Sequence, residues 1–180
     1  MIELVIAKIL RSIITIPQPV DWLLGAILLL GYGVLACSVG FATGWMRFKV
    51  VSSFSQASRI FTTSLFAPAF LEELVFRVAC LPVPKQNLDQ LSWQIVTVNV
   101  IVFVFYHPLN ALTFFPQGRT LFFQPIFLML AGFLGSVCLM SYLFSGSLWL
   151  PVIIHWLVVS CWLIFFDGYG LLYQKATNNL

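Results

Sequence analysis

The sequence predicts an all-α protein that crosses a membrane as a bundle of about five helices. Of its 180 residues, 61% are hydrophobic and only 8% are charged, and its mean hydropathy is +0.99. Soluble domains are about 45–50% apolar and about 25% charged, so a chain of this composition cannot cover itself with a polar surface. The length fits one domain. The net charge of +3 gives no basic footprint of the kind that nucleic-acid binding requires.

Residues 1–19 predict an amphipathic helix that lies in the membrane interface. Apolar side chains occupy most of the helical wheel, and the polar side chains gather in one sector: Lys8, Arg11, Ser12 and Thr15. A helix of this kind lies in the plane of the interface, and two prolines then end it. Residues 20–180 form the predicted transmembrane domain, and its motif-bearing core covers residues 60–166.

Five apolar runs in this domain have the length, about 20 residues, that a spanning helix needs. They cover residues 22–46, 60–81, a stretch that starts near Gln94, and residues 121–144 and 148–166. Pro108 predicts a kink or an end of the third span. The fourth span carries small residues suited to close helix packing, namely Gly132, Gly135, Ser136 and Ser141.

The most informative stretch is Leu71–Val78, where two glutamates and an arginine lie inside an apolar run. Each ion costs about 2.5–3.5 kcal/mol to insert into a membrane, which makes the stretch a candidate functional site. Glu73 and Arg77 stand four residues apart with the acid first, the favourable order for a helical ion pair. Glu72 points about 100° away on the helix and has no evident cation, so it is the better candidate for a chemically free carboxylate.

The only two histidines, His107 and His155, also lie inside apolar runs. Phe103 and His107 share one helix face at a spacing of four residues. A histidine near a carboxylate can position a water and help to deprotonate it. A second histidine can donate a hydrogen bond to the oxyanion of a tetrahedral intermediate. These groups together predict a buried hydrolytic site that needs neither a covalent intermediate nor a metal.

The order and spacing of these motifs resemble a known family. Glu-Glu-x-x-x-Arg at residues 72–77, Phe-x-x-x-His at residues 103–107 and the later His155 are similar to the CAAX protease and bacteriocin-processing family. This family, also called the abortive-infection family, comprises glutamic intramembrane proteases. The resemblance covers residues 60–166. It implies a polytopic helical fold in an unidentified membrane and an environment of membrane lipids.

Specific roles follow from the resemblance. Glu72 would activate water with His107 as its partner, His155 would donate to the oxyanion, and Glu73 and Arg77 would support the site. Phe103 would be a further supporting residue. The implied activity is glutamate-dependent endoproteolysis of membrane-associated peptides or membrane proteins, prenylated ones among them. No cofactor is implied.

The chain departs from the family pattern at one position. The third motif usually continues His-x-x-x-Asn, but Val159 stands four residues after His155. Valine cannot donate a hydrogen bond, and the loss of one oxyanion donor typically lowers a rate about 100- to 1000-fold. Asn110 is a candidate substitute from the neighbouring helix. The departure also favours an alternative function, that of a catalytically silent membrane adaptor or immunity protein with the same scaffold.

Two other classes of function remain as alternatives. Glu72, His107 and His155 have plausible ligand chemistry for zinc, but the sequence lacks a His-x-x-x-His pair and Arg77 disfavours a cation. Buried acids and histidines also form proton relays in transporters, yet no inverted repeat is visible. The four cysteines have no metal-ligand spacing and are interpreted as small packing residues.

Overall fold

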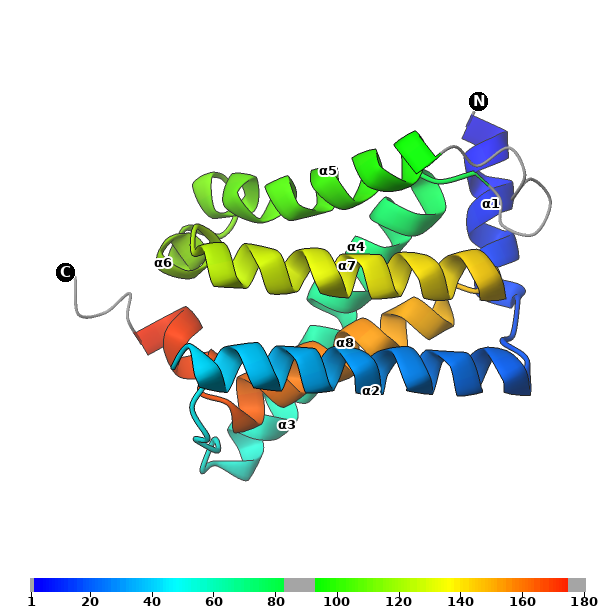
Figure 1. Ribbon diagram of the computed structural model, residues 1–180. Coiled ribbons are helices and arrows are strands. Elements are labelled where there is room, and N and C mark those ends of the chain that lie inside the picture. The colour runs from blue at the N-terminus through cyan, green and yellow to red at the C-terminus, as the bar shows by residue number, and fades with distance from the viewer. Residues whose placement is uncertain (1, 83–92, 175–180) are drawn as a thin grey trace.

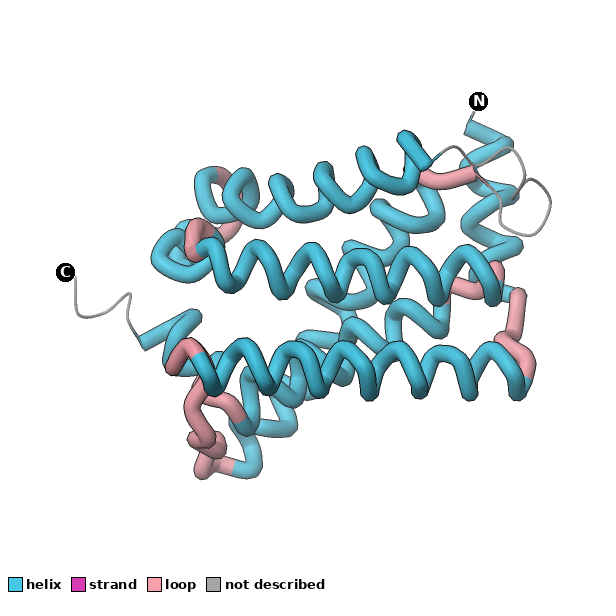
Figure 2. The backbone as a smooth tube through the Cα atoms, in the orientation of Figure 1, coloured by secondary structure: helices cyan, strands magenta, loops and turns pink. Residues whose placement is uncertain are grey.

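A computed structural model describes residues 2–82 and 93–174 (Figure 1). The predicted all-α class is confirmed, with eight α-helices in these residues. Figure 2 shows that helices make up most of the described residues. Three of them, α2 (Pro19–Ala42), α5 (Trp93–Leu112) and α7 (Pro125–Ser145), are long and apolar enough to cross a membrane. A fourth apolar helix, α8 (Trp149–Phe165), is shorter, with 17 residues.

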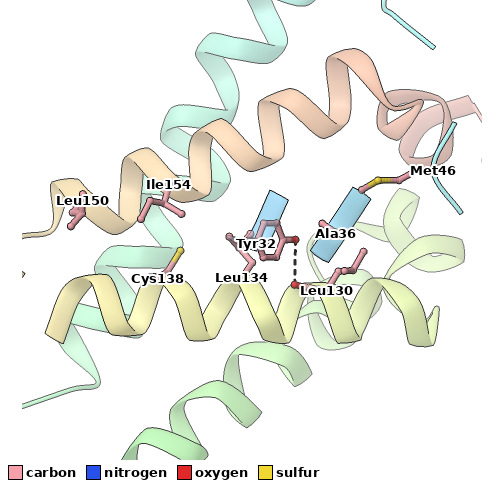
Figure 3. Close-up of a cluster of buried hydrophobic side chains, with 8 residues drawn as sticks. All are labelled: Tyr32, Ala36, Met46, Leu130, Leu134, Cys138, Leu150 and Ile154. Carbon is pink, nitrogen blue, oxygen red and sulfur yellow. Dashed lines mark hydrogen bonds between the residues drawn. The ribbon is translucent and has the colours of Figure 1, made fainter. Parts of the chain in front are cut away.

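The long helices α2, α5 and α7 run side by side, and α7 contacts both of the others and α8 (Figure 1). Figure 3 shows the buried apolar cluster that joins α2, α7 and α8. In this cluster the Tyr32 hydroxyl of α2 donates to the Leu130 carbonyl of α7 at 3.4 Å. The central α7 therefore contacts α2, α5 and α8, and its side chains line part of the cavity described below.

Local signals set the ends of these helices. Pro125 is the first residue of α7, a position where its fixed φ suits the helix, and residues Arg119–Phe122 form a separate short helix, α6. The predicted span 121–144 therefore starts too early. Gly146 (φ 69°) ends α7 in the left-handed conformation. Gly44 (φ 68°) likewise follows α2, which ends at Ala42 rather than at the predicted Met46.

Pro108 does not end the third span. It lies within α5, and that helix continues to Leu112. A proline removes one backbone donor from a helix, but neighbouring helices can compensate for this in a membrane. Of the kink or helix end predicted at Pro108, the helix end is therefore wrong, and α5 can carry its polar face over its full length.

The segment predicted as one continuous span, residues 60–81, is broken. It consists of α3 (Phe54–Ser64), the π-helical turns η1 (Leu65–Phe70), the single turn α4 (Leu71–Glu73) and the π-helical turns η2 (Leu74–Ala79). The backbone leaves the helical region at Ala67 (φ −133°, ψ 114°), directly before Pro68, where the proline ring disfavours helical geometry. The broken segment crosses α8 and brings the acidic pair to the interior (Figure 1).

The N-terminal helix α1 (Ile2–Ile14) lies at one end of the bundle (Figure 1). Lys8 donates from Nζ to the carbonyl oxygens of Ala79 at 3.3 Å and Leu81 at 2.7 Å, so α1 caps the end of η2. The opposite side of α1 leaves apolar side chains exposed, among them Ile6, Leu10 and Ile14. The structure thus has an N-terminal helix with a polar and an apolar side, and its position in the membrane interface stays a prediction.

The contact between α5 and α7 depends on a glycine. A Cβ atom added to Gly135 would lie 2.7 Å from Cδ1 of Phe103. The Phe103 ring is 1% exposed and packs against the Arg77 guanidinium at 4.9 Å, so it has little room to move. We expect Gly135→Ala to lower the free energy of unfolding by about 1–3 kcal/mol, the usual cost of overpacking.

Thermal and chaotrope denaturation in detergent micelles would measure this effect. Gly31→Ala is the matched control because Gly31 lies in α2 and nothing stands within 4 Å of its added Cβ. That change should be neutral or stabilising by up to about 1 kcal/mol, since alanine is the better helix former. Equal destabilisation by both substitutions would contradict the packing argument.

Candidate active site

Glu73 lies at the centre of a buried network of charged side chains. Its Oε2 accepts from Arg77 Nε at 2.8 Å, which confirms the predicted i, i+4 ion pair. Its Oε1 lies 2.8 Å from Nδ1 of His155, which comes from α8. Both Glu73 and Arg77 are fully buried, at 0% exposure. The network thus joins the broken segment to α8 at the level of the acidic pair.

Asn99 of α5 extends this network. Arg77 donates from Nη1 to Asn99 Oδ1 at 2.7 Å, and Asn99 Nδ2 donates to the Phe76 carbonyl at 2.7 Å. Asn99 was not among the site residues predicted from the sequence. A signal was present, because Asn99 stands at i−4 from Phe103 and i−8 from His107, on the same face of α5. A buried amide in an apolar span needs hydrogen-bond partners, so its position on the motif face was informative.

Glu72 lies beside Nε2 of His155, the ring nitrogen that does not face Glu73. Its Oε2 lies 4.0 Å from His155 Nε2, and that oxygen has no hydrogen-bond partner in the described part of the chain. The His155 ring is therefore placed between two carboxylates, Glu73 on Nδ1 and Glu72 on the side of Nε2. Because a carboxylate only accepts hydrogen bonds, Nδ1 carries a proton.

His107 is held by its own helix. Its Nδ1 lies 3.0 Å from the Phe103 carbonyl. A carbonyl only accepts, so Nδ1 is the donor and Nε2 remains an acceptor in the neutral ring. Aromatic rings surround it, with centroids 5.1 to 5.9 Å away: Phe103, Tyr106, Phe122 and Phe127. This enclosure fixes the direction of the imidazole.

The three residues predicted to be catalytic line one cavity of about 1240 Å³: Glu72, His107 and His155. Phe103, Asn110 and Val159 also line it, whereas Glu73 and Arg77 lie behind the wall. Most of the other walls are apolar side chains of α2, α7 and α8. The structure thus brings Glu72, Glu73 and His155 into direct proximity, and His107 and Asn110 face the same space.

A different trio from the predicted zinc ligands lies close enough to hold a metal. The ligand atoms of Glu73, Cys138 and His155 are within 4.8 Å of one another. However, Glu73 and His155 already share a hydrogen bond of 2.8 Å, and the second oxygen of Glu73 binds Arg77. A guanidinium at this distance repels a cation. The donor set therefore fits a hydrogen-bonded network better than a metal site.

Comparison with protein families agrees with this geometry. A helical membrane bundle with a buried Glu–His cluster beside an apolar cavity has the features of an intramembrane hydrolase. A family model described as type II CAAX prenyl endopeptidase Rce1-like matches residues 53–161, more than half of the chain and every motif above. The chain belongs to this family of integral membrane proteases, which confirms the family that the motifs predict. No match was found among curated proteins or solved structures.

Proposed function

We propose that the protein is an intramembrane endopeptidase in which Glu72 activates the attacking water. The observation that carries the proposal is the position of His155 between Glu72 and Glu73, on the wall of the cavity that His107 also lines. A free carboxylate, an acceptor nitrogen and an oriented imidazole then face one space. These are the groups that hydrolysis through a non-covalent tetrahedral intermediate needs.

In the proposed reaction, Glu72 accepts a proton from a water while the water oxygen bonds to the scissile carbonyl carbon. His107 Nε2 accepts a hydrogen bond from the same water and orients it. The proton on Glu72 then passes to the departing nitrogen as the carbon–nitrogen bond breaks. The products are a new carboxyl terminus and a free amine, so general acid–base catalysis accounts for every atom.

His155 is the proposed donor to the oxyanion. Its Nδ1 hydrogen is directed to Glu73, so Nε2 can donate only when the ring carries a second proton. Asn110, which lines the same cavity, is proposed as a second donor in place of the missing asparagine at Val159.

The cavity supports a membrane-associated peptide as substrate, with prenylated peptides as the substrate class that the family name implies. Its mainly apolar walls suit a hydrocarbon chain, and Glu72 lines it where the scissile amide would be hydrolysed. We further propose a domain of residues 20–180 with residues 1–19 in the interface. In this arrangement the broken segment 54–81 and α8 supply the two crossings that complete the predicted five.

Cleavage by the purified protein tests this function. The protein would be reconstituted in phospholipid vesicles with a farnesylated peptide and its unmodified counterpart, and mass spectrometry would identify the products. We expect a single internal cleavage that persists in the presence of 1,10-phenanthroline. Failure to cleave either peptide would count against the endopeptidase, and loss of activity only with the chelator would favour the metal alternative.

Val159→Asn is expected to increase the cleavage rate. Val159 lines the cavity one helical turn from His155, so an amide there can add a donor to the oxyanion. One such donor is worth about 100-fold or more, and we expect a gain of up to about 100-fold in kcat. Val159→Leu, which changes the same position without adding a hydrogen-bond donor, is the matched control and should give no gain.

The second candidate function is the catalytically silent scaffold, and Val159 is the observation that favours it. The same pair of proteins separates the two functions. Activity of the wild-type chain supports the enzyme. A silent wild-type chain that becomes active through Val159→Asn would instead indicate a scaffold that has lost turnover by losing one donor.

A further inference from the structure

We propose that Asn99 is a positioning residue whose amide fixes Arg77, and through Arg77 and Glu73 the orientation of the His155 ring. The inference rests on the proposed function for its effect on rate. Its effect on the ring can be measured whether or not the protein cleaves peptides. Asn99 does not line the cavity, so it acts through other residues.

Four consecutive hydrogen bonds of 2.7 or 2.8 Å form this chain. The Phe76 carbonyl accepts from Asn99, Asn99 accepts from Arg77, Arg77 donates to Glu73, and Glu73 bonds to His155. The residues come from η2, α5, α4 and α8, which are separate parts of the fold. A displacement at one end of the chain therefore reaches the other through direct contacts.

These four hydrogen bonds are costly to lose because the side chains that form them are buried. Asn99 is 6% exposed, Arg77 and Glu73 are 0% exposed, and His155 is 3% exposed. A buried charged group that loses a partner cannot replace it with bulk water. The guanidinium already has one nitrogen, Nη2, without a hydrogen-bond partner among the described residues. Among the described residues, loss of Asn99 would leave the Arg77 guanidinium with Glu73 and the Phe103 ring.

The amide of Asn99 satisfies both neighbours of the residue. The guanidinium can only donate and the Phe76 carbonyl can only accept, so the side chain must present an oxygen to one and an N–H to the other. Aspartate would meet the carbonyl with an acceptor and would compete with Glu73 for Arg77. Leucine would meet both with a methyl group. Both replacements therefore change how Arg77 is held, because leucine removes one of its acceptors and aspartate draws the guanidinium away from Glu73.

The consequence reaches the histidine because the two oxygens of Glu73 have separate tasks. Oε2 binds Arg77, and this leaves Oε1 directed at Nδ1 of His155. If Arg77 moves, the carboxylate can rotate about its last bond and Nδ1 loses its acceptor. The ring then no longer presents Nε2 to Glu72 and the cavity in a fixed direction.

The test uses the fact that the chain has only two histidines, His107 and His155. Protein labelled with ¹⁵N in the imidazole rings, in detergent micelles, gives one set of signals for each ring, and His107→Gln assigns them. In the wild type we expect a slowly exchanging Nδ1–H signal from His155. In Asn99→Asp and Asn99→Leu we expect that signal to be lost, while the His107 signals stay unchanged.

Ser145→Ala is the control variant. Ser145 is 1% exposed and donates to the Ser141 carbonyl on α7, away from the network. Loss of its hydroxyl therefore destabilises the protein without changing the hydrogen bonds between Asn99 and His155. A His155 signal that remains in both Asn99 variants as it does in Ser145→Ala would overturn the proposal. Asn99→Asp, nearly the same size as the native residue, keeps the test valid if Asn99→Leu does not fold.

Cleavage kinetics supply the second readout. We expect kcat to fall about 10- to 100-fold in Asn99→Asp, the range for a small misplacement of a reacting group, with KM within twofold of the wild type. A fall in kcat without the NMR change would overturn the route through His155. If the wild type does not cleave, the proposed function fails, and the imidazole signals still decide the role of Asn99.

Discussion

Replacement of Glu72 by glutamine is expected to lower the rate of peptide cleavage about 100- to 10,000-fold, the contribution that a positioned acid–base group makes. Glutamine has nearly the same volume and can still fill the space beside His155. It cannot accept the proton of an attacking water, so only the chemical step should be affected. Glu72 is 8% exposed and Oε2 has no hydrogen-bond partner in the described residues, so little stability depends on its charge.

Initial rates of the purified variant in vesicles, with a farnesylated peptide, measure this effect. Glu3→Gln is the matched control, because Glu3 is an exposed acid in the first turn of α1 and contacts nothing in the site. The control should cleave at the wild-type rate. Full activity of the Glu72→Gln protein would sink the assignment of the water-activating residue.

Replacement of Arg77 by methionine is expected to destabilise the protein by about 3–5 kcal/mol, because it leaves a buried carboxylate without its cation. Glu73 and Arg77 are both fully buried and joined at 2.8 Å. The double variant Glu73→Gln/Arg77→Met removes both charges and should recover much of the loss. Glu73→Ala alone should also lower stability, since it leaves the guanidinium without its carboxylate.

Thermal unfolding in micelles, followed by circular dichroism, gives these differences. Lys49→Met is the control because Lys49 forms an ion pair of the same type with Asp167 at 3.0 Å, but its side chain is 60% exposed. An exposed pair contributes at most about 1 kcal/mol. A loss in Arg77→Met no larger than in the control would show that burial does not set the strength of the network.

The sequence was sufficient to predict the parts of the site that depend on local spacing. The pair Glu73–Arg77 follows from a helical interval of four residues, and the shared face of Phe103 and His107 follows from the same interval. The bond between Glu73 and His155 joins residues 82 positions apart. No local pattern predicts such a contact, so the resemblance to a family supplied what spacing could not.

The main error concerned the segment that carries the glutamates. Its apolar composition predicts one continuous span, because proline is tolerated in membrane helices and Pro68 gave no decisive signal. The structure breaks the segment at Ala67 and divides it into short helical pieces. The break lies directly before Pro68, and the pieces on both sides of it pack against α8, which lies far along the chain. The role of Asn99 was missed for the same reason, since its partner Arg77 belongs to another element.

The broken segment also has a consequence for biosynthesis. Residues 65–79 carry three ionisable side chains, each of which costs about 2.5–3.5 kcal/mol to insert alone. Their partners Asn99 and His155 emerge from the ribosome later, on α5 and α8. We therefore expect the segment to remain at the membrane surface until α8 has been synthesised. Its movement into the bilayer and the formation of the Glu–His cluster would then be a single event, so an incompletely translated chain would lack this cluster.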